Sequence, residues 1–309
     1  MQNKYTKQLI IIDKDTGEVL QEVPMKSTEC VDIVDYRKKL NDNQKKHLQD
    51  KNNLKQFNHE MGGFVVLYYN NLIYNGDLNL DMATITRVIY LATYIDYNTN
   101  ILISNNGYAS GKKIIPMTKK DIKNIMRLSV GGFNEFFNTL IDKKILIENS
   151  DKTFTISNKY FTKGDNINKK EDYTRVYIDT IRELYINTQA RQHKTLAYTF
   201  RLIEKVDFKT NIICKNPNDK YNKPEKMGLK DIGEYLKINT EKKNLNKFKN
   251  SLYKININRD GKKYYIFKRI IIESGAGSND YFIINPMLFY RGNDYSTVCD
   301  IIKTLYIEG

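Results

Sequence analysis

The chain has few of the residues that build disulfide frameworks, and it has no long apolar run. Its three cysteines, Cys30, Cys214 and Cys299, are odd in number and far apart, and they form no CxxC pair. This pattern is typical of a protein in a reducing cytoplasm. No apolar run approaches the roughly 18 to 20 residues of a membrane span, and the polar residues 1–7 are not typical of a signal peptide. We therefore expect a cytoplasmic protein with no membrane partner.

Combinations of catalytic residues are also missing. His47, His59 and His193 lie on unrelated segments, and the sequence contains no HxH, HExxH or Cys/His cluster. His193 stands among polar helix residues and is expected at the surface. Residues 107–113 only superficially resemble a phosphate-binding loop, because the glycine spacing is one residue short and Lys113 replaces the Ser or Thr that would hold Mg²⁺. We expect no enzyme activity, no catalytic residue, no metal ligand and no cofactor.

Acidic residues are outnumbered by basic ones. The 309 residues include 50 Lys and Arg against 36 Asp and Glu, which gives a formal net charge of +14 and a pI of about 9.3. Such an excess favours a polyanionic partner. Nucleic acid is the first candidate, and an anionic membrane surface is the second. An AT-rich genome, which encodes Lys and Asn at high frequency, would produce the same excess, so charge alone does not decide the partner.

The first 60 residues predict a hairpin and a basic linker. Apolar strands at residues 9–12 and 18–23 flank a turn at residues 13–17, in which Gly17 supplies a positive φ. Residues 25–60 are mostly polar and charged, so they are expected to form a linker or a loosely held helix.

The next hundred residues predict a winged helix. We expect a buried helix over residues 64–74, a second helix over 81–97 and a short strand over 100–103. Thr118 would cap a helix over residues 119–127, and a tight turn leads to a helix over 132–144. Strands over 145–147 and 154–156 complete the order helix, turn, helix and hairpin that is typical of a winged helix-turn-helix.

The pattern restarts after a polar linker at residues 165–172. A shift of 111 residues places Val176 on Val65 and residues 210–213 on 99–102, and a shift of 110 places Met227 on Met117. A nearly constant offset over more than 70 residues indicates an internal duplication. The second copy would carry its helix-turn-helix at residues 229–254 and a longer hairpin region at 255–285, with turns at 258–261 and 275–278.

These patterns define the predicted fold and domains. The fold class is α+β, mainly helical, with two tandem winged helix-turn-helix domains and an N-terminal β-hairpin. The expected domains are residues 1–60 for the hairpin and basic linker, 61–165 for the first winged helix and 172–309 for the second.

Donor side chains concentrate on the two predicted helix-turn-helix units and their hairpins. Asn can read adenine and Lys serves phosphate or guanine, so these residues are candidates for binding double-stranded DNA. Residues 241–270 hold ten basic and two acidic residues, whereas residues 117–147 hold six and three. The candidates are Lys119, Lys120, Lys123, Arg127, Ser129, Asn134, Asn138, Lys242, Lys243, Asn244, Asn246, Lys247, Lys249, Asn250, Arg259, Lys262 and Lys263.

Two motifs carry a resemblance to a known family. The sequence D-K-D-T-G-E-V at residues 13–19 and N-P-M-L-F-Y-R-G-N-D at residues 285–294 resemble the plasmid replication protein L family of Gram-positive bacteria. Members of that family have a D-E-x-G-E-V start, a winged helix-turn-helix and an N-P-x-L-x-x-R-G end. The first copy has Ser157 and Asn158 in place of Asn285 and Pro286, and Lys163 in place of Arg291. With two winged helices, the chain is similar in architecture to the initiators of iteron plasmids.

The resemblance implies a plasmid or phage replication initiator that binds repeated sites at an origin without catalysis. If both second helices dock on one face of the duplex, they should read sites about 34 Å apart. Two alternatives stay open, because winged helices serve many functions. One is a phage or mobile-element transcriptional regulator. The other is a protein–protein adaptor, in which the less basic first copy has turned to protein contacts. Replication or transcription proteins and a second copy of the chain are further partners that these functions allow. The closing stretch itself is expected to be mainly structural, with a phosphate contact open only for Arg291 and its weaker counterpart Lys163.

Overall fold

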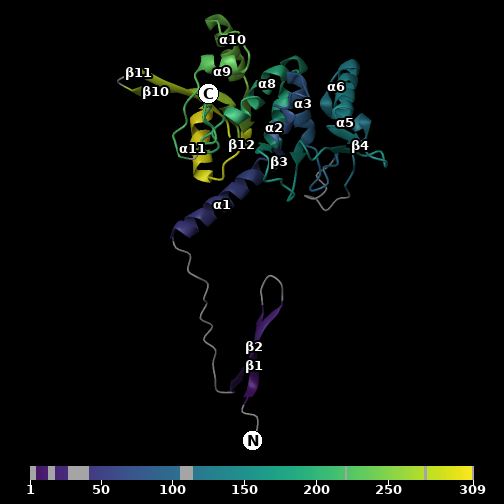
Figure 1. Cartoon of the computed structure of the whole chain (residues 1–309), viewed down its shortest axis with the longest axis vertical. Helices are drawn as coiled ribbons and strands as arrows, with labels where there is room; N and C mark the ends of the chain where they lie inside the picture. The colour runs from purple at the N-terminus through teal and green to yellow at the C-terminus, as the bar shows by residue number, and fades with distance from the viewer. Residues whose placement is uncertain are drawn as a thin grey trace. The chain divides into compact units, whose positions relative to one another are not determined.

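The computed structural model describes residues 5–12, 18–26, 42–104, 114–219, 221–274 and 277–307 (Figure 1). The chain forms two compact units, Met1–Lys45 and Lys46–Gly309. The predicted turn at residues 13–17, the loop at 107–113 and the tip at 275–276 lie outside the described residues.

The first unit contains the predicted hairpin. Strand β1 (Tyr5–Ile12) pairs antiparallel with β2 (Val19–Lys26), and Ile10 faces Glu22 in the register. The prediction of two strands in this region is confirmed.

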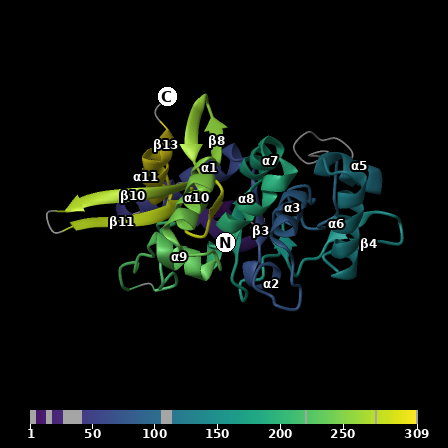
Figure 2. The same cartoon turned by 90° about the horizontal axis from the view of Figure 1, so that it is seen from above.

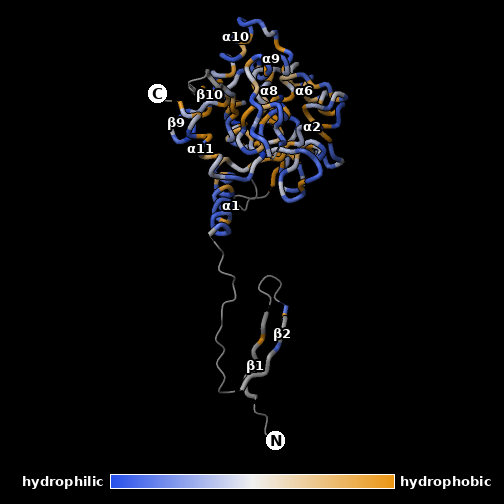
Figure 3. Tube along the Cα trace, turned by 60° about the vertical axis from the view of Figure 1, so that its left-hand side comes forward, coloured by the Kyte–Doolittle hydropathy of each residue, from blue (hydrophilic) through white to orange (hydrophobic). Residues whose placement is uncertain are grey.

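Helix α1 (Asp42–Glu60) occupies part of the predicted linker. Most of its side chains are exposed, but Leu54, Phe57 and the following Met61 are buried in the core of the second unit. Figure 3 shows the corresponding pattern, a mainly hydrophilic helix with a few hydrophobic positions. The second half of α1 therefore belongs to the folded second unit, and the expected boundary at residue 60 falls later than the observed one.

A four-stranded antiparallel sheet is shared between the two predicted copies. Its order is β12 (Phe289–Tyr290), β7 (Thr174–Tyr177), β3 (Phe64–Leu67) and β6 (Phe161–Thr162). The prediction of a helix over residues 64–74 is therefore wrong in its first part. An apolar run this short is compatible with a buried strand or a helix, and pairing with strands on both sides decides for the strand. A short helix, α2 (Tyr69–Leu72), follows it.

The remaining elements of the first half follow the predicted order. Helix α3 (Met82–Ala92) starts at the cap Asp81, and α5 (Lys119–Met126) starts at Thr118, which forms a capping box with Asp121. Helix α6 (Val130–Asp142) begins two residues earlier than expected, and the hairpin of β4 (Leu146–Glu148) and β5 (Phe154–Ile156) follows it.

The second half repeats this order with additions. Its helices are α7 (Ile178–Asn187), α8 (His193–Phe200), α9 (Leu229–Tyr235) and α10 (Lys242–Tyr253). Its strands form a short hairpin, β8 (Asn256–Arg259) with β9 (Lys262–Tyr265), and a longer one, β10 (Phe267–Ser274) with β11 (Gly277–Ile284). The longer hairpin protrudes from the unit in Figures 1 and 2.

Equivalent contacts occur in both halves, and they keep the offset that the sequence indicates except at Ile283, which lies in the longer hairpin region of the second half. The bridges Ile95–Leu102 and Ile101–Thr155 have counterparts in Val206–Ile213 and Ile212–Ile283. The left-handed residues Arg127 (φ 50°) and Lys237 (φ 56°) stand at the same place, after the first helix of each pair. Repeated backbone contacts of this kind support the predicted duplication.

The two halves meet along α3 and α8, which lie side by side in Figures 1 and 2. The Thr86 hydroxyl donates to the His193 carbonyl at 2.9 Å. The rings of Tyr90 and Tyr185 stack with centroids 3.7 Å apart, and the His193 ring lies 4.3 Å from that of Tyr185. The expectation that His193 lies at the surface is wrong: the residue is 2% exposed, because its polar helix packs against the other half.

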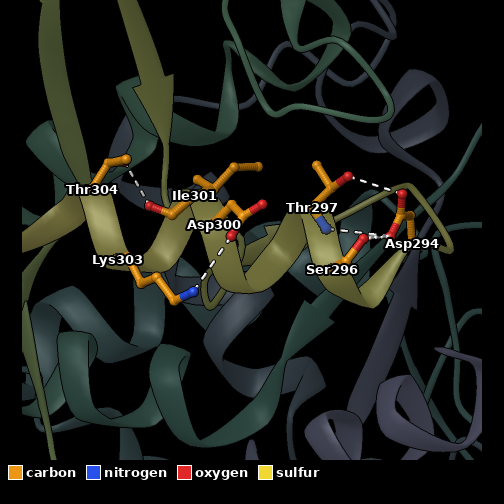
Figure 4. A network of polar contacts seen from close by, with 7 residues as sticks. All are labelled: Asp294, Ser296, Thr297, Asp300, Ile301, Lys303 and Thr304. Atoms are coloured by element: carbon orange, nitrogen blue, oxygen red, sulfur yellow. Dashed lines mark hydrogen bonds and ion pairs between the residues drawn. The ribbon is translucent and has the colours of Figure 1, made fainter. Parts of the chain in front are cut away.

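The closing stretch at residues 285–294 is structural, as expected. Met287, Leu288 and Phe289 are buried, and Asp294 caps helix α11 (Tyr295–Leu305). The Asp294 carboxylate accepts hydrogen bonds from the Ser296 hydroxyl at 2.7 Å and the Thr297 hydroxyl at 2.9 Å (Figure 4). The strand β13 (Tyr306–Ile307) then joins β9. Within the described residues, no helix combines the length and the apolar character needed to cross a membrane.

Candidate nucleic-acid interface

Helix α10 is held by an apolar face and by the helix before it. Leu245, Phe248 and Leu252 are buried at helical spacing, and the Phe248 ring meets Tyr198 edge to face at 5.2 Å. A Cβ added to Gly233 of α9 would lie 2.4 Å from Leu245, so the close approach of the two helices requires glycine there. These contacts fix which face of α10 points outward.

The outward face of α10 carries amides and ammonium groups. At 3.6 residues per turn, Lys243, Asn246, Lys247 and Asn250 fall within about 100° of arc, opposite the buried residues. All four side chains are exposed. They line a groove of about 1000 Å³, together with Lys254 at the end of the helix.

The other walls of this groove come from distant parts of the sequence. The end of α7, the start of α8 and the β8–β9 hairpin contribute mostly polar side chains. The apolar residues Leu184, Leu196 and Ile255 also line the groove. Glu183 is the sole acidic residue among the described groove residues, against four lysines. The polar side chains of these walls are Asn187, Thr188, Gln192, Thr195, Asn256, Asn258 and Lys263.

The three other α10 candidates have different surroundings. Lys242 is exposed in the first turn, beside Lys243. The Asn244 amide donates to Glu241 at 3.3 Å, and the Lys249 ammonium lies over the Tyr253 ring at 5.8 Å from its centroid. The groove therefore brings together only some of the α10 candidates. Lys243 and Lys247 line it, whereas Lys242, Asn244 and Lys249 do not.

Arg259 of the short hairpin is engaged within the chain. Its guanidinium forms an ion pair with Glu183 at 3.0 Å and donates to the Thr180 hydroxyl at 3.2 Å. The Glu183 carboxylate also accepts the backbone N–H of Asn258 at 2.7 Å. We therefore assign Arg259 to holding the hairpin on α7 instead of to DNA. Lys262 and Lys263 stay exposed on β9.

The first-half candidates divide between α5 and α6. Lys119 and Lys120 are exposed and Lys123 is half-buried on α5, and the Lys119 ammonium lies over the Phe137 ring at 4.3 Å. Arg127 is exposed at the left-handed end of α5. On α6, Asn134 and Asn138 are exposed.

Ser129 is occupied by the fold. It is the N-cap of α6, and its hydroxyl oxygen accepts the N–H of Gly132 at 3.2 Å. The Ser129 hydroxyl therefore provides a hydrogen-bond acceptor for a backbone N–H at the start of α6, which would otherwise need solvent or a ligand.

Arg291 and Lys163 occupy equivalent structural positions. Arg291 donates to the Val206 carbonyl at 3.3 Å and to the Asn218 amide oxygen at 2.9 Å. Lys163 donates to the Ile95 carbonyl at 3.2 Å, and burial lowers the pKa of its ammonium. Each cation thus bonds a carbonyl in the segment that follows α3 or α8, so its side chain is directed into the fold instead of toward a phosphate.

The far wall of the groove was not found from the sequence. Asn187, Thr188 and Gln192 stand in a short polar stretch about 50 residues before α10. Only the packing of α7 and α8 against α10 brings them opposite its outward face. No group of three or more His, Cys, Asp or Glu in the described part of the chain is arranged to hold a metal ion.

No protein-family model matches the chain, and comparisons with curated proteins and with solved structures also find no match.

Proposed function

We propose that the chain is a non-catalytic double-stranded DNA-binding protein built from two tandem winged helices. The observation that carries the proposal is the outward face of α10, where Lys243, Asn246, Lys247 and Asn250 line a large groove beside the β8–β9 hairpin. A helix-turn-helix places its second helix in the major groove, which admits an α-helix and presents acceptors to Lys and Asn.

The arrangement of each half supports the winged-helix assignment. In the first half, α5 and α6 are followed by the β4–β5 hairpin, and in the second half α9 and α10 are followed by β8–β9. The hairpins would be the wings. Lys262 and Lys263 are exposed on the second wing, where flanking phosphates would be in reach of their side chains.

The resemblance of the two end motifs to plasmid replication proteins favours a replication initiator of a plasmid or phage. A transcriptional regulator is the second candidate, because the same α10 surface would serve a repressor. On either reading the protein acts where DNA is, in the cytoplasm, with replication or transcription proteins or a second copy of the chain as further partners.

Substitution of Lys242, Lys243 and Lys247 by Ala tests the DNA interface. Each phosphate contact contributes about 0.9 to the slope of log K against log salt, so the triple variant should lower that slope by roughly 2 to 3. Fluorescence anisotropy with DNA flanking the gene, at several salt concentrations, measures the effect. The matched control replaces the exposed Lys169, Lys170 and Lys223 by Ala, which removes the same charge elsewhere.

An unchanged slope in the α10 variant would exclude α10 as the interface, and a wild-type chain that binds no DNA at low salt would exclude the proposal itself. To separate initiator from regulator, the gene and its flanking DNA are placed on a replicon that lacks an origin. Autonomous replication supports an initiator, whereas altered promoter output alone supports a regulator.

A further inference from the structure

The two halves carry opposite charge on their second helices. Helix α10 has four lysines and no acidic residue, whereas α6 has no Lys or Arg and contains Glu135 and Asp142. The first helix of each pair shows the reverse distribution of charge between the halves. Helix α5 has three lysines and Asp121, whereas α9 has Lys230 with Asp231 and Glu234.

The first turns of α6 and α10 differ in the same way. In a helix-turn-helix, the N-terminal residues of the second helix contact base edges. Helix α10 begins Lys242, Lys243 and Asn244, all of which carry donors. Helix α6 begins Val130, Gly131 and Gly132, which have no side-chain donor, and Val130 is 61% exposed. The start of α6 therefore offers no side-chain donor to a base edge.

We infer that the two halves divide the contact with DNA: α10 reads bases in the major groove, and the first half holds phosphates through α5 while α6 stays outside the major groove. This inference rests on the proposed DNA binding. Two similar winged helices would contact bases in two regions of the DNA. The inferred division predicts base contacts in one region only.

The lysines of α5 are placed for backbone contact. At 3.6 residues per turn, Lys119, Lys120 and Lys123 fall within about 100° of arc, beside the buried face of Ile122 and Met126. The one acidic residue of α5, Asp121, accepts the N–H and hydroxyl of Thr118 at 2.9 and 2.7 Å. Its carboxylate is thereby directed at the helix start instead of at the lysine face.

The asparagines of α10 indicate which bases are read. Asn246 and Asn250 are exposed four residues apart on the outward face, which separates them by about 6 Å along the helix. Asn pairs with the N6 and N7 atoms of adenine, and base pairs are about 3.4 Å apart. The bound site should therefore contain two adenines about two base pairs apart.

The test compares three double variants of the full chain on a site selected by the wild type from random DNA. They are Lys120→Gln with Lys123→Gln, Asn134→Ala with Asn138→Ala, and Asn246→Ala with Asn250→Ala. All six positions lie on helix surfaces, and circular dichroism verifies that each variant is folded. The readouts are the salt slope and the ratio of specific to non-specific affinity.

The α5 variant should lower the salt slope by about 2 and weaken specific and non-specific binding equally. The variant with Asn246→Ala and Asn250→Ala should lower the ratio of specific to non-specific affinity by about tenfold or more and leave the salt slope unchanged. The α6 variant should change neither. Replacing the two adenines by 7-deazaadenine should weaken the wild type and leave the α10 variant unaffected.

Loss of specificity in the α6 variant would overturn the inference, because α6 would then be a reader. An unchanged salt slope in the α5 variant would overturn it as well. Both outcomes differ from failure of the proposed function, in which the wild type selects and binds no DNA.

Discussion

Two buried asparagines, Asn100 and Asn211, connect each half to its closing strand. Both have left-handed backbones, with φ of 57° and 52°. The Asn100 amide donates to the carbonyls of Ile156 and Phe161 at 3.2 and 2.7 Å, and Asn211 donates to Ile284 and Phe289 at 3.2 and 2.9 Å. Asn suits this position because it tolerates a positive φ and its amide group supplies two N–H donors.

His193 makes the stability of the protein depend on pH. Burial, with the nearby Arg87 guanidinium as a second cause, lowers the pKa of His193 to about 4. Within the part of the chain that the structure describes, neither ring nitrogen has a hydrogen-bond partner, although the backbone at Thr188 and Tyr185 lies close enough to oppose the shift in part. Because the unfolded chain binds the proton near pH 6.5, stability is full above that pH and is lost as the pH falls toward 4. We predict that the free energy of unfolding decreases by about 2 kcal/mol between pH 7 and pH 5.

Urea unfolding of the wild type and of His193→Leu at both pH values checks this prediction. Leu removes the titrating group and fills a similar apolar volume, so the variant should lose less stability on acidification. Equal losses in the two proteins would show that other groups cause the pH dependence.

At the scale of elements, the ion pair between Glu183 and Arg259 holds the β8–β9 hairpin beside the groove. Both side chains are mostly buried, with 19% and 22% of their surface exposed. Removing one partner leaves the other charge with poor solvation, so Arg259→Ala should destabilise the fold by about 1 to 3 kcal/mol. The double variant Glu183→Gln with Arg259→Ala should recover part of this loss.

Thermal unfolding of the wild type and of the single and double variants measures the loss of stability. DNA binding then distinguishes a structural role of Arg259 from a phosphate contact. A structural residue leaves the salt slope unchanged when it is replaced. A slope lowered by about 1 would instead identify a phosphate contact and restore the role expected from the sequence.

Elements with local determinants could be predicted from the sequence. Thr118 and Asp121 supply the capping box of α5, and Leu245, Phe248 and Leu252 reveal the buried face of α10. Strand β3 could not be recognised, because four apolar residues have no period and their pairing partners lie about 100 residues away. The burial of His193 and the far wall of the groove were missed for the same reason, since both depend on contacts between distant segments.

At the scale of the whole molecule, the shared sheet makes the second unit indivisible. The central strands β3 and β7 come from different halves, and each pairs with the other and with the closing strand of its own half. We predict that fragments 42–172 and 172–309 do not unfold cooperatively on their own, because each exposes one edge of a buried strand and the face between α3 and α8.

The matched control is the chain of residues 42–309, which lacks only the hairpin unit and the segment after it. It should show a cooperative thermal transition by circular dichroism. A cooperative transition in the isolated fragment 42–172 would contradict the prediction and restore the first half as an autonomous domain.

The position of β12 also determines when the protein can fold during synthesis. Strand β3 is made early, its partner β7 follows about 110 residues later, and β12 is made only at Phe289–Tyr290. At roughly 5 to 20 residues per second, β3 waits on the order of 10 to 40 seconds before the last strand of its sheet leaves the ribosome. Strand β3 gains its own partners β6 and β7 within about 110 residues, but the outer edge of β7 stays unpaired until β12 is made, so the nascent chain depends on dilution or on chaperones until then.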